Sequence, residues 1–381
     1  MTEVALKGAA RATIDRARDT LVALSHRIHA HPELKFEEER TSAWTAAALS
    51  DAGLPVELGI CALPTAFASR IGRGPLHLAI CAEYDALPGI GHACGHNIIA
   101  ASAVGAALAL APLVDDLGIT LHVLGTPAEE GGGGKIMMLE RGAFAGIHAA
   151  MMVHPTPRED IYPRITAVAH MHVAYTGRES HAAIAPELGV NAADAFTVAQ
   201  VAIGLLRQHL RATDQVHGVV TRGGDVANVV PAHTEGLWMA RARTLAALDE
   251  LRPRVEQCFE AGALATGATL AIRDEAPPYA QMEHDHDMAE LYRANALELG
   301  RPPSADGVGT FSTDMGNVSL AMPSIHPCIA IDTNGAVNHQ PAFAEAAINP
   351  SADRAVVEGA LAMAWTAIDI ATGPLRDRLL R

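Results

Sequence analysis

The stretch "LHLAICAEYDALPGIGHACGHNIIAASAVGAALAL", Leu76 to Leu110, predicts a buried strand, a polar turn and a buried helix in succession. Leu76–Ala82 is a short apolar run bounded by turn residues, and Asn97–Leu113 has a helical pattern. Between them stand three potential metal ligands: His92, Cys94 and His96. On its own, the stretch is compatible with a catalytic metal site, a reactive thiol or an ordinary turn before a core helix.

The same alternation continues through the first part of the chain. Ile119–Leu124 and Ala149–Val153 are further apolar strand patterns, and Gly134–Gly142 lies between them with a helical pattern. Strands that alternate with helices predict an α/β domain with a parallel or mixed sheet and helices on its faces.

From about Ile165 the pattern changes to longer strands. The expected elements are strand Ile165–Tyr175, helix Asn191–Leu210, strands Val216–Val220 and Glu235–Ala242, helix Leu245–Leu264 and strand Ala268–Arg273. This β-α-β-β-α-β order is the ferredoxin-like split arrangement. The sequence therefore predicts a mixed-sheet α/β domain formed by residues 1–164 and 276–381, with a ferredoxin-like domain inserted at residues 165–275.

Composition narrows the classes of function. The 381-residue chain is 49% hydrophobic and has a formal net charge of -15, which argues against nucleic-acid binding. Its five cysteines are an odd number and widely spaced, unlike a disulfide framework. The N-terminal stretch lacks a signal-peptide core, and the apolar run Ile98–Val114 falls just short of the roughly 18 residues of a membrane span. We therefore expect a cytoplasmic protein that binds neither nucleic acid nor membrane.

Metal-capable side chains follow three of the predicted strands. Glu83 and Asp85 come after the first strand, Glu129 and Glu130 after the second, and His154 directly after the third. Ligands of open α/β sheets collect outside the carboxyl ends of the strands. We therefore expect these side chains to meet at one edge of the sheet.

Cys94 and His96 add a thiolate and an imidazole to this set. They flank one glycine, so an extended backbone points both side chains the same way. Such ligands suit Zn²⁺, with Mn²⁺ or Co²⁺ possible where oxygen ligands and water complete the shell. Of the adjacent Glu129 and Glu130, one carboxylate can bind metal while its neighbour takes the proton of the attacking water. Asp85 is suited to accept a hydrogen bond from a ligand histidine.

Other interpretations of these residues stay open. Cys94 could act as a nucleophile with His96 or His154 as its base, although that scheme gives no role to two adjacent glutamates. His92 is expected to do no more than lie in the turn. Gly131–Lys135, GGGGK, lacks the spacing and the Ser or Thr after the lysine that a phosphate-binding loop needs.

Seven motifs in order resemble the co-catalytic metallopeptidase family of aminoacylases, carboxypeptidase G, desuccinylases and amino-acid-conjugate hydrolases. The motifs are EYDALPG, HACGHN, PAEEGGGG, MMVHP, GRESHAAIAPELGVNAADA, NVVPAHTEGLWMAR and NHQPAF. The resemblance runs from about Leu21 to Phe343, nearly the whole chain. CGHN and STDMGN, Ser312–Asn317, are most similar to the aminobenzoyl-glutamate hydrolase and β-alanyl-lysine dipeptidase branch.

The resemblance implies a site for two divalent metal ions, zinc or manganese with cobalt possible. Carried over by matching motif, the implied metal ligands are Cys94, His96, Glu130, His154 and His339. With five ligands for two ions, we expect the thiolate to be shared between them. Glu129 is the implied general base, and Asp85 is implied to lie behind a ligand.

The inserted domain is implied to be a lid through which the protein forms a homodimer. Its His181 resembles a histidine that reaches an active site across the dimer and stabilises the tetrahedral oxyanion. Asn228 and Arg241 match positions that bind the substrate carboxylate, for which a guanidinium fork is well suited.

Two positions depart from the family pattern. Asn97 stands where many conjugate hydrolases have Asp, and Glu83 stands where the peptidase branches have His. The role of His326 in SIHP stays open between structural and substrate-contacting.

We expect metal-dependent hydrolysis of the amide bond of a small N-acyl amino acid, an aminobenzoyl-glutamate-like conjugate or a dipeptide. The alternatives are a non-catalytic binding or scaffold protein on the same fold, and a hydrolase with Cys94 as its nucleophile.

Overall fold

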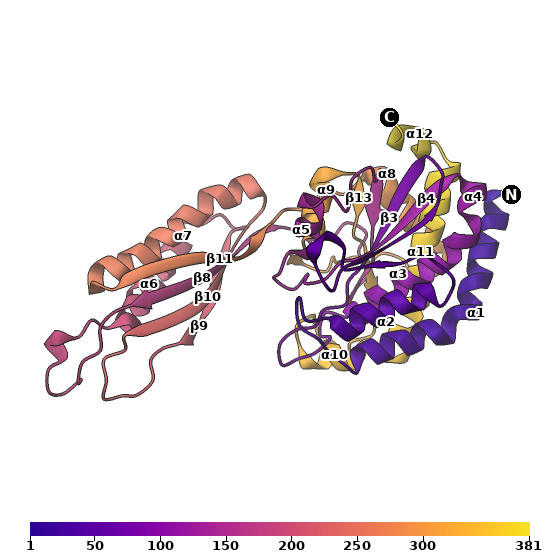
Figure 1. The fold of residues 1–381 in the computed structure, drawn as a ribbon. Helices are drawn as coiled ribbons and strands as arrows, with labels where there is room; N and C mark the ends of the chain where they lie inside the picture. The colour runs from indigo at the N-terminus through magenta and orange to yellow at the C-terminus, as the bar shows by residue number, and fades with distance from the viewer. The chain divides into compact units, whose positions relative to one another are not determined.

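The computed structural model describes residues 1–381, and the chain forms two compact units (Figure 1). Unit 1 consists of Met1–Arg164 and Met282–Arg381, and unit 2 consists of Ile165–Gln281. Unit 1 is thus built from both ends of the chain, and unit 2 is inserted between these ends in sequence.

A six-stranded mixed sheet forms the centre of unit 1. Its order is β1-β2-β4-β3-β5-β13, in which β3 is parallel to β4 and β5, β13 is parallel to β5, and β2 is antiparallel to β1 and β4. The strands are β1 Glu57–Leu58, β2 Phe67–Gly72, β3 Leu76–Ala82, β4 Ile119–Gly125, β5 Ala149–Met151 and β13 Ser324–Ile325. β3 is buried at every position except His77, as expected for a strand covered on both faces.

Shorter elements complete unit 1. The strands are β6 His154–Thr156, β12 Thr310–Phe311 and β14 Cys328–Ala330, and β14 is parallel to β6. The two-residue strand β7, Arg164–Ile165, lies at the boundary between the units in the sequence. The helices besides the three long core helices are α2 Glu39–Ser50, α4 Val114–Leu117, α5 Gly134–Glu140, α8 His286–Glu298, α9 Met315–Ala321, α10 Pro341–Ala346 and α12 Leu375–Leu379.

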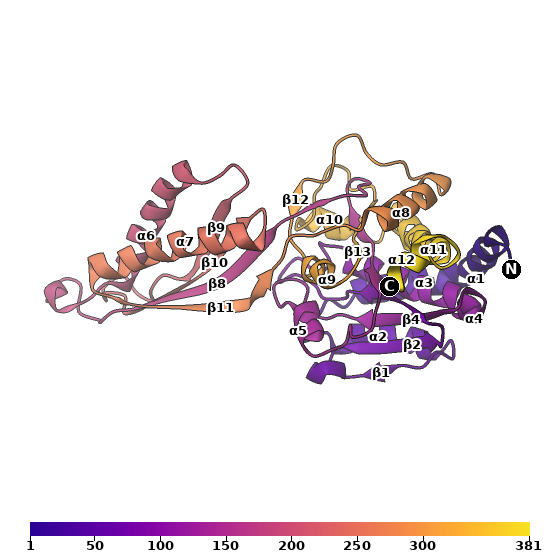
Figure 2. The same cartoon turned by 90° about the horizontal axis from the view of Figure 1, so that it is seen from above.

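Three long helices pack against one another in the core of unit 1: α1 (Glu3–His29), α3 (His96–Leu110) and α11 (Pro350–Thr372) (Figure 2). Two of these helical segments are long and apolar enough to cross a membrane, α11 and the segment His96–Leu117 that begins with α3. Both are mostly buried inside the structure: 89% of the apolar window of α11 and 83% of that of His96–Leu117. A Cβ on Gly105 of α3 would lie 2.7 Å from Ala360 Cβ, so this glycine allows the close approach of α3 and α11. The core therefore holds α3, and the residues at its start, rigidly.

Unit 2 is a four-stranded antiparallel sheet with both of its helices on one face (Figure 1). Its elements are β8 Ala167–Thr176, α6 Ala192–Leu206, β9 Gln215–Arg222, β10 His233–Ala242, α7 Leu245–Thr266 and β11 Thr269–Tyr279. The strand order β11-β8-β10-β9 is that of the ferredoxin-like β-α-β-β-α-β arrangement. Alternate residues of β10, including Trp238, are buried against the helices, which explains why the period-2 pattern identifies this strand.

Unit 2 extends to Gln281, whereas the sequence pattern predicts an end at residue 275. The expected last strand ends at Arg273, but β11 continues through Pro277 and Pro278 with two shifts of register. β11 is an edge strand of the sheet and can therefore contain prolines, because on its open side no neighbouring strand needs the missing backbone N–H as a hydrogen-bond donor.

Candidate metal centre

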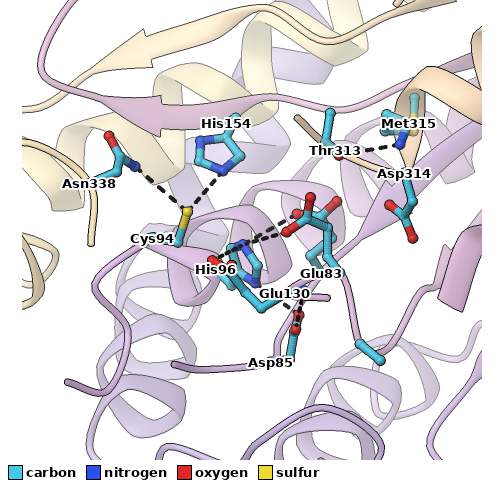
Figure 3. A network of polar contacts seen from close by, with 12 residues as sticks. Glu83, Asp85, Cys94, His96, Glu130, His154, Thr313, Asp314, Met315 and Asn338 are labelled. Atoms are coloured by element: carbon cyan, nitrogen blue, oxygen red, sulfur yellow. Dashed lines mark hydrogen bonds and ion pairs between the residues drawn. The ribbon is translucent and has the colours of Figure 1, made fainter. Parts of the chain in front are cut away.

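Five side chains of unit 1 form two groups that share one thiol. Figure 3 shows four of them: Cys94, His96, His154 and Glu130. Cys94, His96 and His154 form one group, and the potential ligand atoms within it lie within 4.8 Å of one another. Cys94, Glu130 and His339 form the other group by the same measure.

The separations within each group suit a shared cation. Cys94 Sγ lies 3.4 Å from His154 Nε2, and His339 Nε2 lies 3.3 Å from Glu130 Oε1. Two atoms bound to one tetrahedral Zn²⁺ through bonds of about 2.0–2.3 Å lie about 3.3–3.6 Å apart. The residues present therefore fit two divalent ions that share the Cys94 sulfur.

Backbone geometry brings the ligands of different segments together. Gly95, between Cys94 and His96, has φ 74°, and a Cβ there would lie 2.4 Å from Pro155 Cγ. Only glycine allows this approach, which places Cys94 beside His154. His339 itself has φ 69°, an uncommon conformation for a residue with a side chain and one that is frequent at functional sites.

Asp85 contacts one residue of each ligand group through a hydrogen bond. Its Oδ1 lies 2.9 Å from His96 Nδ1, and its Oδ2 accepts a hydrogen bond of 2.9 Å from the backbone N–H of Glu130. His96 Nε2 consequently faces the centre, is fully buried and has no hydrogen-bond partner. A carboxylate that fixes the far nitrogen of an imidazole in this way is typical of metal-binding histidines.

The charges of the site favour the anionic forms of the potential ligands. Burial and Glu130 raise the pKa of Cys94, but His154 and His339 outweigh them and lower it to about 6. Burial also opposes ionisation of Glu130, yet His339 and His96 lower its pKa to about 2. A thiolate and a carboxylate are the forms that bind cations. Hydrogen bonds to Cys94 and Glu130 in turn raise the pKa of His339 to about 11, so a bound metal would displace the proton of this imidazole.

Glu129, the other member of the glutamate pair, has the opposite electrostatic environment. It is 6% exposed, and its Oε2 lies 3.9 Å from His96 Nε2. Burial, followed by the negative charges of Glu83 and Glu130, raises the pKa of Glu129 well above its usual value. Adjacent carboxyls with divergent pKa values indicate a division between binding and proton transfer.

A buried lysine next to these groups was not anticipated from the sequence. Lys135 is fully buried, and its Nζ donates to Glu83 Oε1 and, at 2.7 Å, to Asp314 Oδ1. Its backbone N–H donates to the other oxygen of Asp314 at 2.9 Å. The lysine of the GGGGK run therefore belongs to a structural network of ion pairs and not to a phosphate-binding loop. The sequence feature that could have indicated its burial is its position at the start of the apolar helix KIMML.

A distant segment holds the loop that carries Glu129 and Glu130. Glu38 Oε1 accepts hydrogen bonds from the backbone N–H groups of Phe36 and Ala128, at 2.9 and 2.8 Å. Both donors belong to non-glycine residues with positive φ, 64° and 59°. Lys35 Nζ adds a bond of 3.1 Å to the Gly131 carbonyl. The turn before Glu129 is thus strained and held from two sides.

The three remaining predicted site residues belong to unit 2. The segments that carry His181 and Asn228 lie side by side. His181 forms an isolated antiparallel β-bridge with Val229, and the Ala182 N–H donates a hydrogen bond to the Asn228 carbonyl. Arg241 lies on β10, where its Nε donates to His217 Nε2 at 3.3 Å.

The structure also places Asn97 and His326, whose roles were open, and the turn residue His92. The Asn97 Nδ2 donates to Ser25 Oγ and to the Ala347 carbonyl, at 2.8 and 2.9 Å, and so ties α3 to neighbouring segments. His326 is fully buried and stacks on His154 with ring centroids 5.3 Å apart. His92 is buried but belongs to neither group of potential ligands.

Sequence comparisons give a consistent picture. The sequence profile of peptidase family M20/M25/M40 matches residues 79–356. The Xaa-Arg dipeptidase of Mus musculus is 38% identical over 387 aligned residues, which cover 97% of this chain and 90% of that protein. A polypeptide of the p-aminobenzoyl-glutamate hydrolase of Escherichia coli is 33% identical over 280 residues, 68% of this chain and 58% of that polypeptide.

Solved structures share the fold. A dinuclear metal binding peptidase of family M20 from Bacillus subtilis has a TM-score of 0.69 at 21% identity and covers 93% of this chain and 99% of its own. The aminobenzoyl-glutamate utilization protein of Klebsiella pneumoniae has a TM-score of 0.71 at 17% identity and covers 93% of this chain and 97% of its own.

Proposed function

The chain belongs to peptidase family M20/M25/M40 and is a metal-dependent hydrolase of amide or peptide bonds, and on that premise we propose that its substrate is a dipeptide. The similarity to the Xaa-Arg dipeptidase of Mus musculus supports this class because it extends over 97% of this chain and 90% of that protein. A small N-acyl amino acid or an aminobenzoyl-glutamate-like conjugate is the second candidate, supported by the relative from Escherichia coli.

The observation that carries the proposal is the pair of ligand groups joined at Cys94. Cys94, His96 and His154 would hold one divalent ion, and Cys94, Glu130 and His339 the other. Thiolate and imidazole favour zinc, while manganese or cobalt suits the carboxylate-bearing half. When bound, such ions lower the pKa of water and polarise the scissile carbonyl.

The protein groups would handle the proton and the orientation of the ligands. Glu129 would take the proton of the attacking water and return it to the leaving amine, a task that suits a carboxyl with a raised pKa. Asp85 would keep His96 in the tautomer that presents Nε2 to the metal.

Unit 2 would act as a lid and as the contact between the two protomers of a homodimer. His181 would stabilise the oxyanion of the tetrahedral intermediate, and Asn228 and Arg241 would bind the free carboxylate of the substrate. The guanidinium fork of Arg241 can donate two parallel hydrogen bonds to a carboxylate. We place the protein in the cytoplasm, because all five cysteines are unpaired.

The test is hydrolysis by protein stripped with a chelator and reloaded with zinc, manganese or cobalt. The panel consists of dipeptides with a C-terminal basic residue, N-acyl amino acids and aminobenzoyl-glutamate. We expect metal-restored cleavage of the dipeptides. Activity that survives chelation but is lost on alkylation of Cys94 would instead support a cysteine nucleophile, and cleavage of no substrate would support a scaffold.

The Glu129→Gln variant separates proton transfer from metal binding. We expect it to retain its metal and to lose about two to four orders of magnitude in kcat, the range for loss of a general base. Full activity would contradict the assigned role, and loss of metal would make Glu129 a ligand.

A further inference from the structure

Glu83 is not one of the five proposed ligands, but it belongs to a third group of potential ligands that includes one of them, His96. Glu83, His96 and Glu129 have ligand atoms within 4.8 Å of one another, and all three are buried. Glu83 Oε2 lies 3.5 Å from His96 Nε2, and neither atom has a hydrogen-bond partner (Figure 3). The two atoms attract each other by charge when His96 is protonated, but without a hydrogen bond the cost of burying them is only partly offset.

The separation of these atoms matches a shared cation better than a hydrogen bond. A nitrogen and an oxygen joined by a hydrogen bond usually lie about 2.7–3.2 Å apart. The same atoms bound to one tetrahedral Zn²⁺, with bonds of about 2.0–2.2 Å, lie about 3.4 Å apart. The observed 3.5 Å between Glu83 Oε2 and His96 Nε2 is close to the second value.

The other end of the Glu83 carboxylate is fixed. Lys135 Nζ donates to Glu83 Oε1, and Lys135 is itself held by both oxygens of Asp314. With Oε1 occupied, the carboxylate cannot rotate away, and Oε2 stays directed at His96. A residue that binds one oxygen of a carboxylate while the other oxygen binds metal is a recurrent arrangement around metal ligands.

We propose that Glu83 is a sixth protein ligand, which binds through Oε2 the same divalent ion as His96, and that Lys135 and Asp314 are its positioning residues. The proposal rests on the proposed two-metal function. The added carboxylate would give the ion held by His96 an oxygen ligand from the protein. It explains why an acidic residue at this position is accompanied by a buried lysine, which offsets part of the negative charge.

The test measures metal binding directly. Glu83→Gln and Lys135→Met are titrated with zinc in metal-buffered solution, and bound metal is counted by elemental analysis after dialysis. We expect Glu83→Gln to weaken one ion by about 10- to 100-fold and to leave the other unchanged, with a smaller effect in Lys135→Met. The d–d absorption of the cobalt-loaded protein should change in Glu83→Gln.

Glu159→Gln is the matched control. Glu159 is also a buried glutamate of unit 1, but it is held by Arg301 and the Ala330 N–H and belongs to no ligand group. We expect it to bind both ions as the wild type does.

If a variant fails to fold, the crystal structure of the zinc-loaded wild type tests the proposal instead. Anomalous diffraction should place Glu83 Oε2 about 2.0–2.2 Å from an ion. Two ions bound with Glu83 Oε2 more than about 3 Å from both, or wild-type zinc affinity in Glu83→Gln, would overturn this proposal alone and leave Glu83 as an ion-pair partner of His96. If no ion binds to the wild type, both this proposal and the two-metal function fail.

Discussion

Replacing Glu38 with alanine should both destabilise the protein and slow the reaction. The change removes the acceptor of two backbone N–H groups, and that of Ala128 is fully buried. Two hydrogen bonds contribute about 0.5–1.5 kcal/mol each, and a buried donor without a partner costs about 1–3 kcal/mol. We therefore expect a loss of about 2–4 kcal/mol in the free energy of unfolding.

The catalytic effect follows from the same contacts. Ala128 has φ 59° and directly precedes Glu129, so release of its N–H lets the strained turn relax and shifts the proposed base. A displacement of about 1 Å can cost about 100-fold in rate. We expect kcat to fall by about 10- to 100-fold while bound metal stays at the wild-type level.

Thermal denaturation, chemical denaturation and steady-state kinetics measure these effects. At about 2 °C per kcal/mol for a unit of this size, Tm should fall by roughly 4–8 °C. Glu38→Gln keeps an acceptor oxygen and should lose less than about 1 kcal/mol. Glu37→Ala, at the exposed neighbouring position, should change stability by under about 0.5 kcal/mol. If Glu38→Ala behaves like Glu37→Ala in both assays, the clamp has no energetic role.

Three other outcomes follow from packing and charge. In Gly105→Ala, the new Cβ would lie 2.7 Å from Ala360, and this overpacking should cost about 1–3 kcal/mol, offset by about 1 kcal/mol from the better helix propensity of alanine. Gly204→Ala has open space around the new Cβ and should be stabilising, so equal shifts of the two variants in denaturation would contradict the prediction. Asn97→Asp should destabilise by more than about 3 kcal/mol, since a buried carboxylate would face the Ala347 carbonyl; an unchanged Tm would refute it. Burial, followed by Asp85, raises the pKa of Glu38 to about 7 from 4.5, so ionisation disfavours the folded state. The wild type should therefore lose stability relative to Glu38→Gln as the pH rises from about 4.5 to about 7; parallel pH profiles would exclude this.

The parts of the site that follow strands were predictable because parallel strands end at one edge. The run Leu76–Ala82 is strand β3 as expected, and Asp85 after it meets Glu130 after β4. This meeting needs only the hydrophobic pattern and the edge rule.

The contacts that depend on long-range packing could not be predicted in this way. Lys135 follows four glycines and opens an apolar helix, but the sequence does not indicate which groups it contacts. Its burial results from Glu83 and Asp314, which lie 52 and 179 positions away in the chain. Glu38 likewise resembles any other acid in the run EEER, until its bond to Ala128 is seen.

The division of unit 1 between the two ends of the chain sets an order of assembly during synthesis. Unit 2 is continuous and can pair β8 with β11 once Tyr279 has left the ribosome. Helix α3, buried on nearly all sides, lacks its partner α11 until residue 372 emerges, on the order of ten seconds later at typical rates. The side of α3 that packs against α11 therefore stays uncovered until then, and His339 arrives late, so the proposed metal centre can close only when translation is nearly complete.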